Sequence, residues 1–103
     1  MSKICLDFDG VIAESTGIPT QKFEWDQRMP VYQSLEAVNH LIKVGYTVWI
    51  MTSNPEIEKV KDWLKGWGFP DIEVTNIKKP AHVYIDDRAI RFTSWQDIRK
   101  YFV

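Results

Sequence analysis

The sequence has almost no cysteine, and it has no excess of positive charge. Cys5 is the only cysteine among 103 residues. A single thiol excludes an internal disulfide framework, so a reducing compartment fits best. The 13 basic side chains are balanced by 14 acidic ones, which gives a formal net charge of -1. A protein that mainly coats nucleic acid needs a basic excess, so this class is disfavoured, although local basic patches remain possible.

Long hydrophobic runs are also missing. No apolar stretch approaches the length of a membrane span, and the N-terminus has no signal-peptide core. We therefore expect a cytoplasmic protein without a membrane partner. The composition is otherwise that of a globular chain, with 45% hydrophobic and 26% charged residues. At this length the chain is predicted to form one domain over residues 1–103.

Short apolar segments alternate with stretches of helical periodicity. Strands are predicted at residues 4–8, 46–51, 72–74 and 83–85, the second and the last of them as buried strands. Residues 10–33 have mixed composition and no sustained period, so they are predicted to form a loop or flap. Its aromatic residues should fold onto the body; they are Phe23, Trp25 and Tyr32.

Three helices are predicted between and after these strands. The first should follow Ser34 as N-cap and end near Gly45. The second should begin with Asn54 as N-cap and Pro55 in the first turn, and should bury Ile57, Val60, Leu64 and Trp67. The third covers "SWQDIRKYF", with Ser94 as cap. Strands that alternate with helices predict a parallel sheet with right-handed crossovers.

The first predicted strand runs into two carboxylates in "KICLDFDGVIAE". Side chains alternate along a strand, so Asp7 and Asp9 can point the same way, separated by roughly 6 to 7 Å. Like charges so close repel each other unless a cation or a proton compensates them. The spacing therefore indicates a metal site, a proton-transfer role, or both.

Further polar residues follow the other strands. Thr52 and Ser53 come after the second strand, Lys78 and Lys79 precede the last, and Asp86 and Asp87 follow it. In open parallel sheets, ligands bind beyond the carboxyl ends of the strands. Oxygen ligands without His or Cys favour Mg²⁺. A hydroxyl at a helix start and a lysine suit a phosphate group, and an aspartate can act as nucleophile toward phosphorus. These residue types together indicate phosphoryl transfer.

The ordered set "LDFDGV", a strand ending in Thr52, a lysine before the last strand and "VYIDDR" resembles the haloacid dehalogenase (HAD) superfamily of phosphotransferases. The resemblance covers the whole chain. It implies a three-layer, Rossmann-like α/β fold with a parallel sheet of about four strands, flanking helices and no cap domain. It also implies a Mg²⁺-dependent phosphatase that forms an aspartyl-phosphate intermediate.

The resemblance assigns a role to each matching residue. Asp7 resembles the nucleophile, Asp9 the general acid/base, and Thr52 and Lys79 the groups that orient the phosphoryl group. Lys78 is the alternative to Lys79, and the phosphate would also contact Ser53 and Asn54. The Mg²⁺ ligands would come from Asp7, Asp9 (through its carbonyl), Asp86 and Asp87, with the choice between the last two left open.

Substrate and partners are less well defined by the sequence. A phosphorylated small molecule and a nucleic-acid terminal phosphate are both compatible with an open site, and a second subunit could supply a lid. The alternative function is a receiver-like or catalytically silent phosphate-binding module. Receivers usually have adjacent acids after the first strand, whereas here the adjacent acids follow the last strand.

Overall fold

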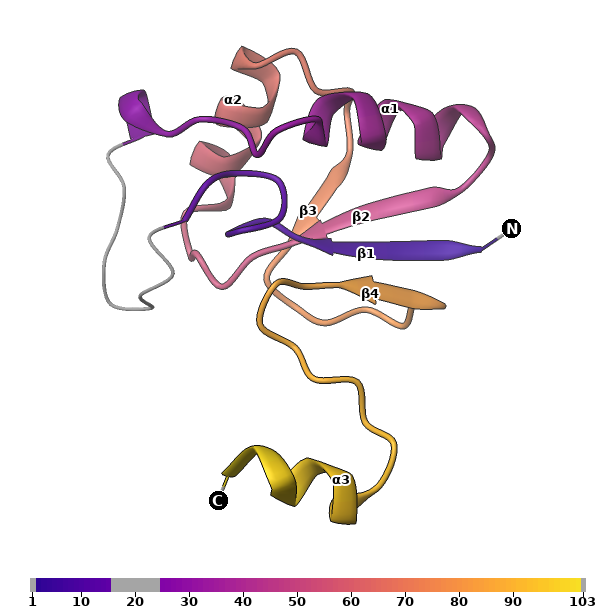
Figure 1. The fold of residues 1–103 in the computed structure, drawn as a ribbon. Coiled ribbons are helices and arrows are strands. Elements are labelled where there is room, and N and C mark those ends of the chain that lie inside the picture. Colours follow the sequence, from indigo (N-terminus) through magenta and orange to yellow (C-terminus); the bar gives the residue numbers. More distant parts are fainter. Residues whose placement is uncertain (1, 16–24, 103) are drawn as a thin grey trace.

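The protein is described by a computed structural model that covers residues 2–15 and 25–102. Its sheet has four strands, β1 (Lys3–Asp7), β2 (Thr47–Met51), β3 (Glu73–Thr75) and β4 (Val83–Ile85). The α-helices are α1 (Ser34–Lys43), α2 (Ile57–Gly66) and α3 (Trp95–Arg99). Two short 3-10 helices are η1 (Trp25–Gln27) and η2 (Lys100–Phe102). Figure 1 shows α1 and α2 on the sheet and α3 apart from it.

All strand pairs are parallel, in the order β3-β2-β1-β4. The chain thus moves outward from β1 to β3 and returns to the other side of β1 for β4. This confirms the predicted α/β class with a four-stranded parallel sheet. The described residues contain no cap domain. None of the helices among them is long and apolar enough to cross a membrane.

The core lies between the sheet and the helices α1 and α2. Ile4 and Leu6 of β1 pair with Val48 and Ile50 of β2, and all four are buried. The helices contribute Val38, Val60, Trp63 and Leu64 to the same cluster. Phe8 follows β1 and is completely buried, packed edge-on against Trp63 at a centroid distance of 5.3 Å. The residue after β1 is therefore anchored in the core.

The helix starts differ from the predicted ones. Ser34 is the first residue of α1 and not its cap, and its hydroxyl donates to the Ile12 carbonyl at 3.2 Å. Before α2, the Asn54 side chain accepts from the Glu56 amide at 2.9 Å, so Asn54 forms a turn and the helix begins at Ile57. A polar side chain can close a turn, as Asn54 does, or bond a distant carbonyl, as Ser34 does, and either bond competes with helix capping.

Two predicted core positions are wrong. Trp67 follows α2 and is 41% exposed, while Trp63, four residues earlier, is buried in its place. Of the flap aromatics, Trp25 packs on Phe8 at a centroid distance of 6.3 Å, but Tyr32 is 87% exposed. Phe23 lies outside the described residues.

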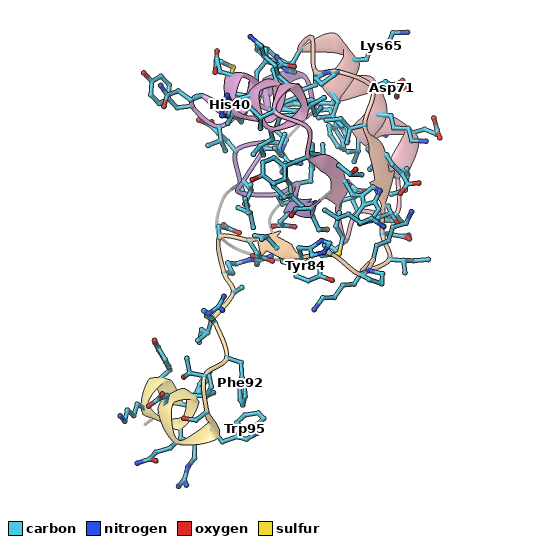
Figure 2. The ribbon with its side chains drawn as sticks, turned by 90° about the vertical axis from the view of Figure 1, so that its right-hand side faces the viewer. His40, Lys65, Asp71, Tyr84, Phe92 and Trp95 are labelled. Atoms are coloured by element: carbon cyan, nitrogen blue, oxygen red, sulfur yellow. The ribbon has the colours of Figure 1, made fainter. Side chains whose placement is uncertain are left out.

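The C-terminal part departs most from expectation. β4 is present, but it is not buried, because Val83, Tyr84 and Ile85 are 49%, 42% and 41% exposed. Ser94 caps α3 as predicted by accepting from the Asp97 amide at 3.1 Å, yet α3 has no buried residue. Figures 1 and 2 show α3 held away from the sheet. The chain's own α3 therefore does not supply the helical layer expected on the other side of the sheet.

Candidate active site

Three aspartates meet at the carboxyl end of the sheet. Asp7 is the last residue of β1, and Asp86 and Asp87 follow β4, which pairs with β1. One carboxylate oxygen of each lies within 4.8 Å of the others, at a place that could hold a metal ion. Parallel pairing of β1 with β4 explains why residues 79 positions apart in sequence come together.

The turn after β1 leaves room for this cluster. Gly10 has a φ of 89°, a left-handed value that a side chain would strain. A Cβ atom at Gly10 would also overlap the Asp87 carboxylate. The Phe8 carbonyl accepts from the amides of Ile12 and Ala13 at 3.1 and 3.0 Å, which fixes the turn. The glycine in the "DFDG" motif therefore serves the close approach of Asp87.

The crowding of carboxylates changes the acidity of Asp7. Burial raises the pKa of Asp7 to about 7 from the ordinary 3.8, and the charges of Asp86, Asp9 and Asp87 add to this increase. The positive charge of Arg88 acts in the opposite direction on the same pKa. A half-buried carboxyl with three acidic neighbours is a favourable place for a divalent cation, because a cation offsets all of these charges.

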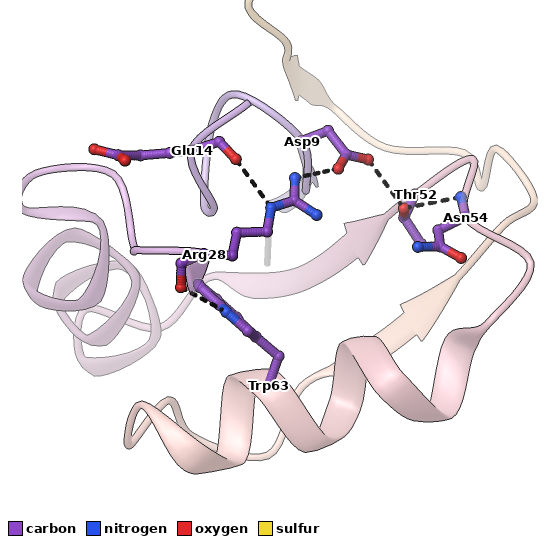
Figure 3. Close-up of polar contacts among 6 residues, drawn as sticks. All are labelled: Asp9, Glu14, Arg28, Thr52, Asn54 and Trp63. Carbon is purple, nitrogen blue, oxygen red and sulfur yellow. Dashed lines mark hydrogen bonds and ion pairs between the residues drawn. The ribbon is translucent and has the colours of Figure 1, made fainter. Parts of the chain in front are cut away.

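Asp9 does not belong to this group of three oxygens. Its carboxylate forms an ion pair with Arg28 and accepts a hydrogen bond from the Thr52 hydroxyl at 3.2 Å (Figure 3). The two carboxylate oxygens of Asp9 are thus held by two different segments, one from the flap and one from the end of β2. Asp9 and Thr52, which were both predicted at this end of the sheet, are in direct contact.

Arg28 is the residue of this site that sequence reasoning missed. It is 7% exposed, its Nε donates to the Glu14 carbonyl at 2.9 Å, and its guanidinium lies 4.9 Å from the Phe8 ring centroid. Its own carbonyl accepts from the Trp63 indole at 3.0 Å. The available signal was weak: a single arginine between Trp25 and Pro30 in a segment without periodicity.

The hydroxyl of Thr52 links Asp9 to the turn that precedes α2. It is 1% exposed, and besides donating to Asp9 it accepts from the Asn54 amide at 3.1 Å. Its amide donates to the Thr75 carbonyl of β3 at 2.9 Å, which places Thr52 as an extension of β2. Ser53 and Pro55 beside it are exposed.

The two candidate lysines make their contacts away from the aspartates. Lys79 forms an ion pair with Glu73, and its Nζ lies 5.3 Å from the Trp49 ring centroid. Lys78 places its Nζ 4.7 Å from the Tyr84 ring centroid. Neither lysine is among the causes of the Asp7 shift, whereas Arg88 is. The structure therefore brings Asp7, Asp86 and Asp87 together, and it brings Asp9 to Thr52. The two lysines instead contact Glu73 and Tyr84.

Comparisons with models of protein families, with curated proteins and with solved structures give no match to this chain. The resemblance to the HAD superfamily consequently depends on the four motifs and on the arrangement of their residues.

Proposed function

We propose that the protein is a HAD-like, Mg²⁺-dependent phosphatase that hydrolyses phosphoric monoesters through an aspartyl phosphate on Asp7. The observation that carries this proposal is the meeting of Asp7, Asp86 and Asp87 at the carboxyl end of a parallel sheet, with the Asp9–Thr52 pair beside them. Its substrates are phosphorylated small molecules or terminal phosphates of nucleic acids.

The donor set fits the metal. Mg²⁺ prefers oxygen ligands and uses one or two carboxylates together with water and substrate phosphate. Asp7, Asp86 and Asp87 offer such oxygens, and the pKa of Asp7 is raised first by burial and then by the charges of Asp86, Asp9 and Asp87. When bound there, Mg²⁺ would offset the charge of these carboxylates and of the phosphoryl group.

In the first step, a carboxylate oxygen of Asp7 attacks phosphorus and forms the acyl-phosphate bond, while the bond from phosphorus to the leaving oxygen breaks. Asp9 in its protonated form, in which its contact with Arg28 is a hydrogen bond and no longer an ion pair, donates a proton to that leaving oxygen, which departs as an alcohol. The Thr52 hydroxyl can hold Asp9 in place through the 3.2 Å hydrogen bond until the proton is transferred.

In the second step, water attacks the phosphorus of the aspartyl phosphate. Asp9, now ionised, accepts the proton of this water, and the bond between Asp7 and phosphorus breaks. Inorganic phosphate leaves, Asp7 is again a carboxylate and Asp9 is again protonated. Atoms and protons balance over the two steps.

One observation favours a second function, that of a module that holds phosphate without turning it over. Lys79 pairs with Glu73, and Asp9 pairs with Arg28, so two groups assigned to turnover are engaged elsewhere. A module of this kind would form a long-lived phospho-Asp7 or bind phosphate without hydrolysis.

The test is hydrolysis of para-nitrophenyl phosphate with Mg²⁺ and with EDTA. We expect release that needs Mg²⁺ and falls at least a hundredfold in Asp7→Asn, because the amide is a poor nucleophile. Asp71→Asn is the matched control, since Asp71 is an exposed aspartate beyond the far end of α2 (Figure 2).

Equal rates in wild type and Asp7→Asn would contradict the nucleophile assignment. Absence of release from folded, Mg²⁺-loaded protein, together with a stable acyl phosphate after treatment with acetyl phosphate, would favour the second function. Mass spectrometry of the intact chain detects that adduct.

A further inference from the structure

The C-terminal helices α3 and η2 form an apolar arm without a surface to pack on. Trp95, Tyr101 and Phe102 are 70%, 66% and 75% exposed, and Phe92 in the preceding segment is 59% exposed. Phe92 and Trp95 pack edge to face with their ring centroids 5.5 Å apart, and α3 otherwise packs mainly on η2. Isolated helices of this length are unstable in water, so the arm needs a partner surface.

A matching surface is exposed on the same chain. β4 lies at the edge of the sheet, and Val83 and Ile85 pair with Ile4 and Leu6 of β1. Ile4 and Leu6 are covered, at 6% and 3% exposure, whereas Val83 and Ile85 remain about half exposed. The apolar face of the sheet therefore continues beyond the area that is covered.

The radius of gyration and the accessible surface of the chain are both larger than those of a compact monomer, as expected for a chain that buries part of its surface against a partner. Its radius of gyration is 14.7 Å, against about 13 Å for a compact domain of this length. Its accessible surface is 7630 Å², roughly 1,600 Å² more than the ~6,000 Å² typical of a folded monomer of this mass. Burying most of this excess on each of two chains would give an interface in the range of about 2,000–5,000 Å² that obligate dimers have.

The segment between β4 and α3 directs the arm away from its own sheet. Residues 86–94 contain a turn in which the Arg88 amide donates to the Asp86 carboxylate at 2.8 Å, and the following residues are exposed. Figure 2 shows the arm apart from the body. Nine residues span at most about 30 Å, enough for the arm to reach the sheet of a neighbouring molecule without change in the body.

From these observations we propose that the protein forms a symmetric dimer by exchange of its C-terminal arm. Residues 95–102 of each copy cover the β4 side of the sheet in the other copy, next to Val83 and Ile85. A two-fold axis relates the two copies, so each arm covers the sheet of the other copy and no arm or sheet edge is left uncovered. This interaction does not depend on Mg²⁺ or on phosphatase activity.

The first test is the mass of the full-length protein by light scattering after gel filtration at micromolar concentration. We expect about 24 kDa, twice the chain mass of 12.1 kDa. Trp95→Asp should raise the dissociation constant at least tenfold, because a buried tryptophan commonly dominates an interface. Tyr32→Asp is the control, because Tyr32 is an exposed aromatic before α1, and it should leave the dimer intact.

The second test separates exchange from packing of the arm on its own sheet. A chain that carries Val83→Cys together with Phe102→Cys is treated with a bismaleimide and run under denaturing conditions. We expect the cross-link to join two chains. A monomeric wild type, a dimer that Trp95→Asp leaves unchanged, or a cross-link within one chain would each overturn the proposal. Circular dichroism of each variant verifies that the sheet is folded.

Discussion

The guanidinium of Arg28 is paired with the carboxylate of Asp9, 19 residues earlier in the chain, and is itself almost completely buried. This contact joins the flap to the end of β1. The Asp9 side chain is 28% exposed, so solvent reaches it, while the arginine lies against the Phe8 and Trp25 rings. The flap residues that the structure describes are therefore part of the site.

Replacing Arg28 with methionine should destabilise the protein by about 2–3 kcal/mol. Loss of one partner from a buried ion pair costs about 3–5 kcal/mol, and the partial exposure of Asp9 reduces this. Arg28→Lys keeps the charge but loses the bond from Nε to the Glu14 carbonyl, so we expect a smaller loss of about 1 kcal/mol. Urea unfolding measures both.

The control for this prediction is Arg91→Met. Arg91 is an exposed arginine in the segment after β4, and its replacement should change the free energy of unfolding by less than about 0.5 kcal/mol. If Arg28→Met and Arg91→Met were equally mild, the Arg28–Asp9 pair would not contribute to stability.

The acidity of Asp7 predicts how stability depends on pH. The pKa of Asp7 is raised to about 7 from 3.8, so the folded state binds the proton more tightly than the unfolded state. The contribution of this group is then most favourable below pH 3.8, is lost as the pH rises, and is fully lost above about 7. Without Mg²⁺, Asp7→Asn should therefore gain about 1–2 kcal/mol over wild type between pH 4 and 8, after allowance for solvent screening.

The measurement is urea unfolding of both proteins in EDTA across this pH range, compared as a difference so that other titrating groups cancel. Under the proposed function, Mg²⁺ stabilises wild type at pH 8 more than it stabilises Asp7→Asn. A difference between the two proteins that does not vary with pH would show that Asp7 titrates normally.

Gly10 should tolerate no side chain. Gly10→Ala places a methyl group against the Asp87 carboxylate and strains a backbone with a φ of 89°. We expect a loss of about 1–3 kcal/mol, together with weaker binding of Mg²⁺ because Asp87 must move. Thermal unfolding and metal titration by calorimetry measure the two effects.

Gly66→Ala is the matched control for Gly10→Ala. Gly66 ends α2, and a Cβ atom there meets no atom within 4 Å. Alanine is a better helix former than glycine, so this variant should be stabilised by up to about 1 kcal/mol. Equal effects at both glycines would contradict the combined strain of the positive φ and the Asp87 contact at Gly10.

The hydrophobic periodicity predicted the fold class. The rule that ligands bind beyond the carboxyl ends of parallel strands predicted where the aspartates lie. Ile4 and Leu6 lie in a continuous apolar run, and such runs between helices form parallel strands whose carboxyl ends share one edge. The proximity of Asp7, Asp86 and Asp87 could therefore be predicted from the sequence. The same rule predicted that Asp9 and Thr52 lie at this edge, but not that the Asp9 carboxylate stands apart from the other three and contacts Arg28 and Thr52.

The contacts of Arg28 and Lys79 could not be predicted in this way. Arg28 lies in a segment without periodicity, and its burial depends on the rings of Phe8 and Trp25. Lys79 has a long side chain that reaches Glu73 from the loop before β4, a choice that depends on tertiary structure. The exposure of β4 was likewise hidden, because an apolar strand looks the same in sequence whether or not a helix covers it.

The hydroxyl of Thr52 supports the last prediction. It donates to Asp9 and accepts from the Asn54 amide, and both bonds are lost in Thr52→Val, which keeps the shape of the side chain. A buried site that loses two hydrogen-bond partners should be destabilised by about 1–3 kcal/mol, and the phosphatase rate should fall at least tenfold because Asp9 loses its support. Thr52→Ser keeps the hydroxyl and should retain most of the activity at a small cost in packing. Activity of the valine variant equal to that of the serine variant would mean that the hydroxyl does not hold Asp9 during the reaction.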